Sequence, residues 1–263
     1  MSNPPAKTLG ETVLATRHYT DRLFVFKTTR AQSFRFRSGE FAMLGLETDG
    51  KPLLRAYSIA SPSWSDELEF VSIKVPNGPL TSKLAKVKPG DQIILKPRTT
   101  GTLVLDALLP GRTLWLVSTG TGIAPFASIV RDPQTYEDYE HVYLTHTCRE
   151  NAELAVGFDL MAEIAADPLV SEIVGDKLTH VPTVTRDQPP EGTLKGRITH
   201  LVESGALFDS LGVPAWSPET DRVMICGSTE MINDTKDLCE KAGLTEGSNS
   251  SPGEYVVEKA FVG

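Results

Sequence analysis

The chain has 263 residues and a formal net charge of −8 at pH 7. Its 40% hydrophobic and 23% charged residues are typical of a soluble globular protein, and its length favours two domains. Residues 1–7 lack the apolar run of a signal peptide and no stretch reaches membrane-spanning length, so we expect a cytoplasmic protein without a membrane partner. Three scattered cysteines and five histidines without ligand spacing predict no metal site.

The two halves of the sequence carry charge of opposite sign. Residues 1–107 contain 15 Lys and Arg against 10 Asp and Glu, whereas residues 108–263 contain 11 against 24. A basic N-terminal half favours an acidic partner, although a chance imbalance explains the counts equally well. The basic residues are spread along this half and not clustered, which argues against nucleic acid as the partner.

Between residues 11 and 106, segments rich in β-branched and aromatic residues alternate with turn signals such as Asp49-Gly50 and Asn77-Gly78-Pro79. This pattern predicts a small antiparallel β-barrel with one short helix at residues 79–86. The expected strands are 11–19, 22–29, 41–46, 53–60, 68–75 and 92–96.

After Pro110-Gly111, apolar strands alternate with helices, which predicts a parallel, doubly wound α/β sheet. We therefore expect two domains, residues 1–107 and residues 108–263. The expected strands of the second domain are 113–118, 141–147, 178–184, 222–226 and 255–262, and its expected helices are 124–130, 151–166 and 229–242.

The stretch Arg55-Ala56-Tyr57-Ser58 places a cation, an aromatic ring and a hydroxyl inside an apolar strand. Period-two alternation puts Arg55 and Tyr57 on one face of that strand. A guanidinium binds phosphate and a tyrosine ring stacks on a flat heterocycle, so this face suits a flavin nucleotide. The alternative is an ordinary barrel strand with an exposed Arg55 and a core Tyr57.

The segment Thr119-Gly120-Thr121-Gly122 follows an apolar strand and precedes a helix. Glycines at a strand end let a ligand approach the backbone, and the helix start offers free amides to a pyrophosphate. Pro125 replaces the third glycine of a G-x-G-x-x-G motif, so a purely structural turn stays open. The later segment Cys226-Gly227-Ser228 repeats the order of strand, glycine and helix cap, although a lone Cys226 is more often buried filler than a ligand contact.

Three arginines, Arg149, Arg186 and Arg197, follow predicted strands or their loops in the acidic half. In dinucleotide-binding folds, an arginine near the end of the second strand accommodates the 2′-phosphate of NADP, whereas an acidic residue there holds the ribose of NAD. Arg149 favours NADP, and the adjacent Glu150 leaves NAD open. Each arginine taken alone is better explained as a surface salt-bridge partner.

Taken in order, these motifs resemble those of a known family. Four segments, Arg55-Ala56-Tyr57-Ser58, Gly78-Pro79-Leu80-Thr81-Ser82, Gly120-Thr121-Gly122-Ile123-Ala124-Pro125 and Cys226-Gly227-Ser228-Thr229-Glu230-Met231, resemble the bacterial ferredoxin (flavodoxin)–NADP reductases across essentially the whole chain. The resemblance implies an FAD-binding barrel and an NADP(H)-binding α/β domain. It also implies hydride exchange with NADP(H) and single-electron exchange with ferredoxin or flavodoxin, docked on the basic FAD-domain side of a monomer.

The resemblance also assigns site residues. FAD is expected to contact Arg55, Ala56, Tyr57, Ser58, Val71, Ser72, Ile73, Lys74, Val75, Leu80, Thr81, Ser82, Thr121, Ala260 and Phe261. NADP is expected to contact Thr119, Gly120, Thr121, Gly122, Arg149, Arg186, Arg197, Cys226 and Gly227. The expected catalytic set is Ser58, Cys226, Glu258 and Ala260.

The C-terminus departs from the plastid-type relatives, which end in an aromatic residue that stacks on the flavin. Ala260 stands at the matching place here and is followed by Phe261-Val262-Gly263. In the bacterial branch this extension resembles a lid over FAD, so Phe261 is the expected stacking ring. We expect movement of this tail to gate hydride transfer.

Three other functions stay open on the same sequence. A reductase component of an oxygenase and a free-flavin reductase share the expected fold, although the absence of an appended cysteine cluster argues against reductases that carry an iron–sulfur centre. A nucleotide-binding redox sensor without turnover is the alternative from a different class.

Overall fold

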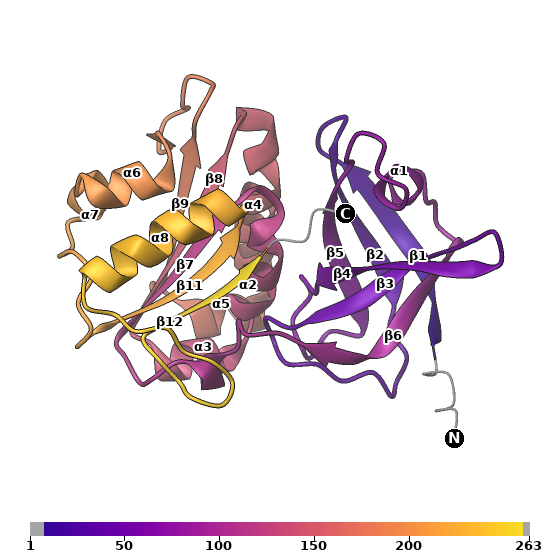
Figure 1. The fold of residues 1–263 in the computed structure, drawn as a ribbon, viewed down its shortest axis with the longest axis horizontal. Helices are drawn as coiled ribbons and strands as arrows, with labels where there is room; N and C mark the ends of the chain where they lie inside the picture. Colours follow the sequence, from indigo (N-terminus) through magenta and orange to yellow (C-terminus); the bar gives the residue numbers. More distant parts are fainter. Residues whose placement is uncertain (1–7, 260–263) are drawn as a thin grey trace.

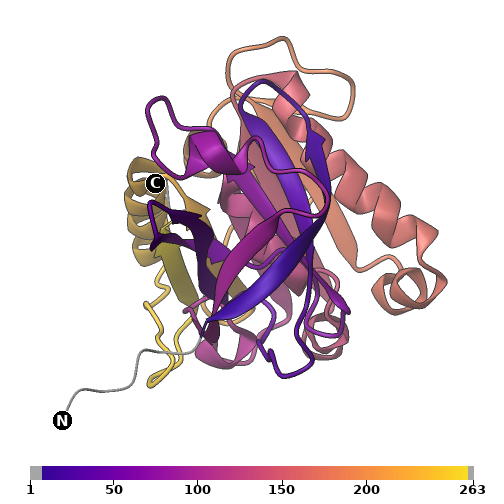
Figure 2. The ribbon, with the colours of Figure 1, turned by 90° about the vertical axis from the view of Figure 1, so that its right-hand side faces the viewer.

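The computed structural model describes residues 8–259, which form two halves side by side (Figure 1). In the N-terminal half, six strands form one antiparallel sheet in the order β4-β3-β6-β1-β2-β5. Edge strands β4 and β5 come close to each other, so the sheet curls into the predicted barrel (Figure 2). Its elements are β1 (Leu9–His18), β2 (Leu23–Thr29), β3 (Phe41–Thr48), β4 (Lys51–Ser58), β5 (Glu67–Ile73), α1 (Thr81–Leu84) and β6 (Gln92–Thr100).

The C-terminal half contains a six-stranded parallel sheet in the order β10-β9-β8-β7-β11-β12, as the alternation of strands and helices predicts. The order reverses between β7 and β11, which is where ligands bind in such sheets. Its strands are β7 (Thr113–Thr119), β8 (His141–Cys148), β9 (Leu178–Val184), β10 (Leu194–Lys195), β11 (Asp221–Gly227) and β12 (Tyr255–Lys259). Its helices are α2 (Ile123–Ile129), α3 (Pro133–Asp138), α4 (Ala155–Ala166), α5 (Pro168–Val174), α6 (Ile198–Glu203), α7 (Ala206–Leu211) and α8 (Thr229–Lys241), with 3₁₀ turns η1 (Leu105–Ala107), η2 (Gly120–Gly122) and η3 (Asn151–Leu154).

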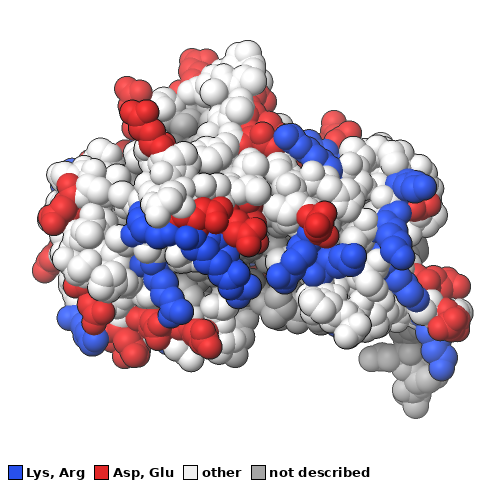
Figure 3. Space-filling view, turned by 90° about the horizontal axis from the view of Figure 1, so that it is seen from above, with Lys and Arg blue, Asp and Glu red and all other residues white. Residues whose placement is uncertain are grey.

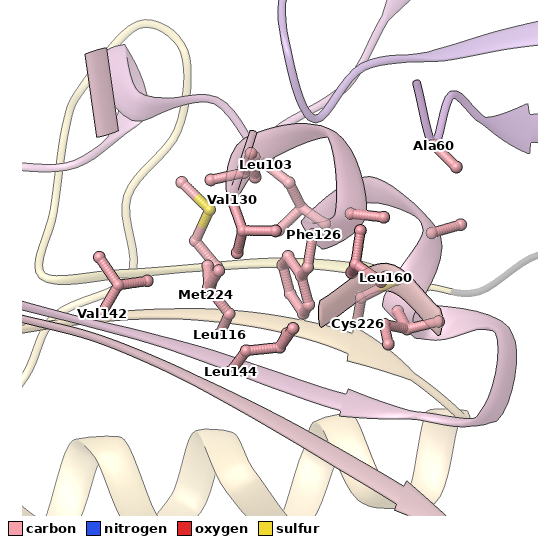
Figure 4. Close-up of a cluster of buried hydrophobic side chains, with 14 of the residues drawn as sticks. Ala60, Leu103, Leu116, Phe126, Val130, Val142, Leu144, Leu160, Met224 and Cys226 are labelled. Carbon is pink, nitrogen blue, oxygen red and sulfur yellow. The ribbon is translucent and has the colours of Figure 1, made fainter. Parts of the chain in front are cut away.

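Each face of the parallel sheet has its own hydrophobic core. Alternate residues of β7 face opposite sides: Leu116 packs with α2 and α4, whereas Trp115 packs with α7 and α8. The cluster on the α2 side extends to barrel residues such as Val71 and Ala60, the latter labelled in Figure 4. This cluster therefore spans the contact between the two halves, while the barrel also has a separate core of its own, with Phe26 and Phe70 among its residues.

Polar contacts reinforce this junction. Arg131, which follows α2, donates to the carbonyl oxygen of Ala60 at 2.7 Å and to the Glu69 carboxylate at 3.3 Å. The Tyr19 hydroxyl donates to Asp159 of α4 at 2.7 Å. Because these contacts lie between partly buried groups, they fix the orientation of the halves more firmly than exposed pairs would.

The structure differs from the sequence prediction in several elements. The predicted strand 92–96 extends to Thr100, because Pro97 lies where the β3–β6 register shifts and so removes no regular ladder bond. The predicted helix 79–86 is only four residues long, and the N-terminal turn of the predicted helix 151–166 is η3. Strand β10 and helices α3, α5, α6 and α7 were not predicted, since seven or fewer residues are too short for periodicity to be visible. Two of these helices carry an Asp-Pro start, at Asp132 and Asp167, that does announce a helix.

No helix within residues 8–259 is long and apolar enough to cross a membrane.

Candidate functional site

A pocket of about 810 Å³ lies between the barrel and the carboxyl ends of the parallel strands. Strands β7 and β11 pair directly, and the strand order reverses between them, so the loops after both strands lead away in opposite directions and leave a crevice at the carboxyl edge of the sheet. Thr119, Gly120 and Thr121 follow β7, and Gly227 and Ser228 follow β11. The facing wall comes from the barrel.

The glycines after β7 have two different physical roles. Gly120 has φ +53° and no atom within 4 Å of the place where a Cβ would stand, so it is selected by the turn itself. Gly122 packs so closely on β11 that a Cβ would lie 2.2 Å from the carbonyl oxygen of Cys226. The Thr119 hydroxyl also accepts a hydrogen bond from the Ser228 amide at 3.3 Å. Close packing of Gly122 and a hydrogen bond to Thr119 therefore hold the turn against the end of β11.

The structure brings Arg149, Arg186 and Arg197 together at one end of this pocket. Within residues 8–259, none of the three guanidinium groups takes part in a salt bridge or donates a hydrogen bond to the protein, so the salt-bridge interpretation of these arginines is not supported. All three side chains are exposed. Three unpaired guanidinium groups that line one pocket have the charge and the donors to pair with a multiply charged anion.

Backbone contacts hold this arginine end in place. The Arg186 amide donates to the Arg149 carbonyl at 2.9 Å, which links the loops after β8 and β9. The Glu153 carboxylate accepts from the amides of Arg149 and Glu150, and the Lys195 ammonium donates to the Arg186 carbonyl at 2.9 Å. Sequence reasoning missed Glu153, although its spacing from Glu150 is that of a capping box.

The other expected NADP residues divide into two groups. Thr119, Gly120, Thr121 and Gly227 line the pocket together with the arginines. Gly122 and Cys226 lie beneath its surface and do not line it, and Cys226 is only 1% exposed.

Cys226 and Glu258 are buried neighbours on paired strands β11 and β12. Burial, reinforced by the Glu258 charge, raises the pKa of the Cys226 thiol well above its usual range. Burial also raises the pKa of Glu258 to about 7, with a hydrogen bond from the Thr102 amide opposing the shift and the Glu40 charge adding to it. The Oε1 atom of Glu258 has no hydrogen-bond partner within the described chain. The buried Glu258 carboxyl group therefore combines a pKa raised toward neutrality with one unpaired oxygen.

Strand β4 places Tyr57 against the barrel core. Its ring meets Phe26 and Phe70 edge-on, with centroids 6.4 Å away in each case, and its hydroxyl shares a 3.0 Å hydrogen bond with Ser72. Burial raises the pKa of Tyr57, and the Ser72 hydrogen bond and nearby Arg55 oppose the shift. The ring is 9% exposed, so only a small part of it is available to a ligand in this structure.

The remaining residues expected to contact FAD differ in their exposure. Ile73 and Val75 line the pocket. The side chains of Ala56, Val71, Ser72, Leu80 and Thr81 are buried, and those of Ser58, Lys74 and Ser82 are at least partly exposed. The Thr81 hydroxyl accepts from the Val75 amide at 3.1 Å, and the Ser82 hydroxyl donates to the Gly78 carbonyl at 2.7 Å. Ala260 and Phe261 lie outside the described residues.

The residues present fit both expected nucleotides. The half-buried Arg55 guanidinium donates to the Leu54 carbonyl at 2.9 Å and has no carboxylate partner in the described chain, so it remains available to phosphate. The unpartnered Oε1 of Glu258 suits a polar group of a bound ring. At the other end, the three arginines suit a 2′-phosphate. No group of His, Cys, Asp and Glu within residues 8–259 could hold a metal ion.

Comparison with known proteins agrees with this arrangement. Residues 16–102 match the oxidoreductase FAD-binding domain and residues 116–237 match the oxidoreductase NAD-binding domain. The flavodoxin/ferredoxin–NADP reductase of Rhodobacter capsulatus is 55% identical over 98% of this chain and 96% of its own. Ferredoxin–NADP reductase A of Sorangium cellulosum is 54% identical over 96% of this chain and 90% of its own.

A solved structure gives the same result for the fold. The ferredoxin–NADP⁺ reductase of Neisseria gonorrhoeae, crystallised with bound FAD and NADP, superposes with a TM-score of 0.88 at 32% identity, covering 97% of this chain and all of that one. The chain therefore belongs to the ferredoxin (flavodoxin)–NADP reductases.

Proposed function

We propose that this protein is an FAD-dependent oxidoreductase that exchanges a hydride with NADP(H) and single electrons with ferredoxin or flavodoxin. The observation that carries the proposal is the single pocket that joins the Gly120–Thr121 turn to three unpaired arginines and faces the barrel. Membership of the family supports it, and the comparisons favour neither an oxygenase-reductase component nor a free-flavin reductase nor a sensor.

When bound, FAD accepts a hydride and releases electrons one at a time, and the protein supplies position and electrostatics. We propose that Arg149, Arg186 and Arg197 bind the 2′-phosphate and that the Gly120–Thr121 turn binds the pyrophosphate. Buried Cys226, against whose carbonyl oxygen Gly122 packs, would support the glycine turn beside the bound nucleotide. Glu258, with its pKa near neutrality, holds or gives up a proton at its unpartnered Oε1.

We propose further that the acidic carrier docks on the basic barrel side, that the protein acts as a monomer in the cytoplasm, and that its domains are residues 1–107 and 108–263. The charge of the barrel half supports the docking side. Lys and Arg side chains gather on both sides of the junction between the halves (Figure 3).

An absorbance experiment tests the function. The purified protein is expected to be yellow, and its flavin absorbance should bleach on anaerobic addition of NADPH and return on addition of oxidised ferredoxin or flavodoxin. NADH is expected to act more slowly. Bleaching without transfer to a carrier would favour the sensor, and a preference for NADH would contradict the role of the arginines.

A further inference from the structure

Arg22 is a cation of the barrel that lines the nucleotide pocket. It stands in the turn between β1 and β2, where its amide donates to the Thr20 hydroxyl at 3.1 Å and its carbonyl accepts from the Lys74 amide at 2.8 Å. The backbone of Arg22 is therefore held firmly beside β5. Its guanidinium is exposed and makes no hydrogen bond or salt bridge to other described residues.

The position of Arg22 relative to the other arginines indicates what it binds. Arg149, Arg186 and Arg197 follow β8, β9 and β10 at one side of the sheet. Arg22 comes instead from the wall that carries Ile73 and Val75, and β5 of that wall packs near the Gly120–Gly122 turn. A cation on this wall faces the place proposed for the pyrophosphate.

The charge of the pocket lining also singles out Arg22. Four arginines line the pocket, and so do three carboxylates, those of Glu153, Glu230 and Asp234. Without Arg22 the ionised lining side chains would balance at three against three. Arg22 therefore gives the lining a net positive charge, which favours a dinucleotide with several negative charges.

We propose that Arg22 binds the pyrophosphate of NADP(H) from the barrel side, opposite the Gly120–Thr121 turn, and so acts as a nucleotide-binding residue contributed by the FAD domain. This inference rests on the proposed function. The nucleotide then bridges the two halves, with its 2′-phosphate on the α/β domain and its pyrophosphate between them.

Binding of two nucleotides to the purified holoprotein tests this role. NADP⁺ contains the pyrophosphate, whereas adenosine 2′-monophosphate offers the 2′-phosphate end alone. Arg22→Ala is expected to weaken NADP⁺ binding about tenfold in a calorimetric titration and to change adenosine 2′-monophosphate binding by less than twofold. Arg22→Lys should recover part of the NADP⁺ affinity, because lysine keeps the positive charge. The recovery should be incomplete, since lysine lacks the planar guanidinium that donates two hydrogen bonds to one phosphate.

Two further variants make the outcome specific. Arg186→Ala is expected to weaken both nucleotides, since it removes a 2′-phosphate contact. Lys88→Ala removes a positive charge from an exposed turn of the same half that does not line the pocket, and it should change neither affinity.

Three results would overturn the inference: an unchanged NADP⁺ affinity in Arg22→Ala, equal weakening of both nucleotides, or the same effect from Lys88→Ala. Because the exposed Arg22 side chain makes no hydrogen bond or salt bridge within the described protein, thermal unfolding of the variant should match the wild type. If the NADP(H) specificity in the proposed function were wrong, the unmodified protein itself would not bind NADP⁺ or adenosine 2′-monophosphate, and that outcome is distinguishable from all three.

Discussion

Two sets of residues proposed for nucleotide binding and chemistry lie in opposite surroundings. At the exposed end of the pocket, three arginines extend from loops and have no partner within the described chain. Cys226 and Glu258 do not line the pocket and lie buried on paired strands β11 and β12, where burial raises both of their pKa values. Substitution of an exposed arginine should therefore change ligand binding with little effect on folding, whereas substitution around the buried pair should change the stability of the fold.

The largest effect on stability is expected at Gly122, where the turn after β7 packs against Cys226 of β11. Gly122→Ala places a Cβ 2.2 Å from the Cys226 carbonyl oxygen and should lower the free energy of unfolding by about 4 kcal/mol, because backbone must move. The matched change Gly120→Ala meets no atom within 4 Å and should cost only about 1 kcal/mol, from its positive φ. Chemical denaturation of both variants measures the difference, and equal losses would contradict the packing role of Gly122.

The next effect concerns protonation of Glu258. Its folded pKa of about 7 lies above that of a free carboxyl, so the folded state binds the extra proton and stability falls as pH rises from about 4.5 to 7. Glu258→Gln removes this dependence and should stabilise the protein relative to wild type at pH 8 by up to about 3 kcal/mol. Denaturation midpoints at pH 5 and pH 8 measure it. Parallel pH profiles for the two proteins would rule the shift out.

A smaller effect is expected at the exposed end. Arg186→Ala should raise KM for NADPH about 10- to 30-fold with little change in kcat, because a charge-assisted phosphate contact contributes about 2 kcal/mol to binding. Preference for NADPH over NADH should fall by the same factor. Arg112→Ala is the control, since this exposed arginine pairs with Glu140 at the opposite end of the sheet. A fall in kcat alone would place Arg186 in the chemical step instead.

The smallest effect concerns the surface around the site. The basic barrel half predicts that affinity for ferredoxin or flavodoxin falls several-fold between 50 and 500 mM salt, because screening shortens the reach of exposed charges. Titration of the carrier at several ionic strengths measures this dependence. A flat affinity would show that docking does not use the charge of the barrel half.

Local rules were sufficient to predict most of the architecture and part of the site. The order of strand, glycines and helix at residues 113–130 follows from local chemistry, and the strand order of the sheet brings its glycines to the reversal point. Arg149, Arg186 and Arg197 were predicted because each follows a predicted strand or its loop. The same local rules gave no way to tell an unpaired arginine from a salt-bridged one.

What sequence reasoning missed depends on packing between distant segments. Whether an arginine is paired depends on which carboxylates come near it in space, and Arg22 reaches the pocket only because the barrel packs against the sheet. A core Tyr57 was one of two alternatives from the sequence, and only the packing of Phe26 and Phe70 from two other strands shows that its ring is buried. Such contacts join segments that are far apart in the sequence, so no local pattern of hydrophobic residues predicts them.

The hydrophobic cluster that continues from the parallel sheet into the barrel has a consequence for folding. Leu23, Val25, Ala60 and Val71 of the barrel share this cluster with α2 and the sheet. Separating the halves would expose apolar surface on both, so neither is expected to be soluble alone and the chain should melt in one transition. Because the NADP-binding half and the FAD-binding half are expected to unfold together, the binding of either cofactor should stabilise both halves.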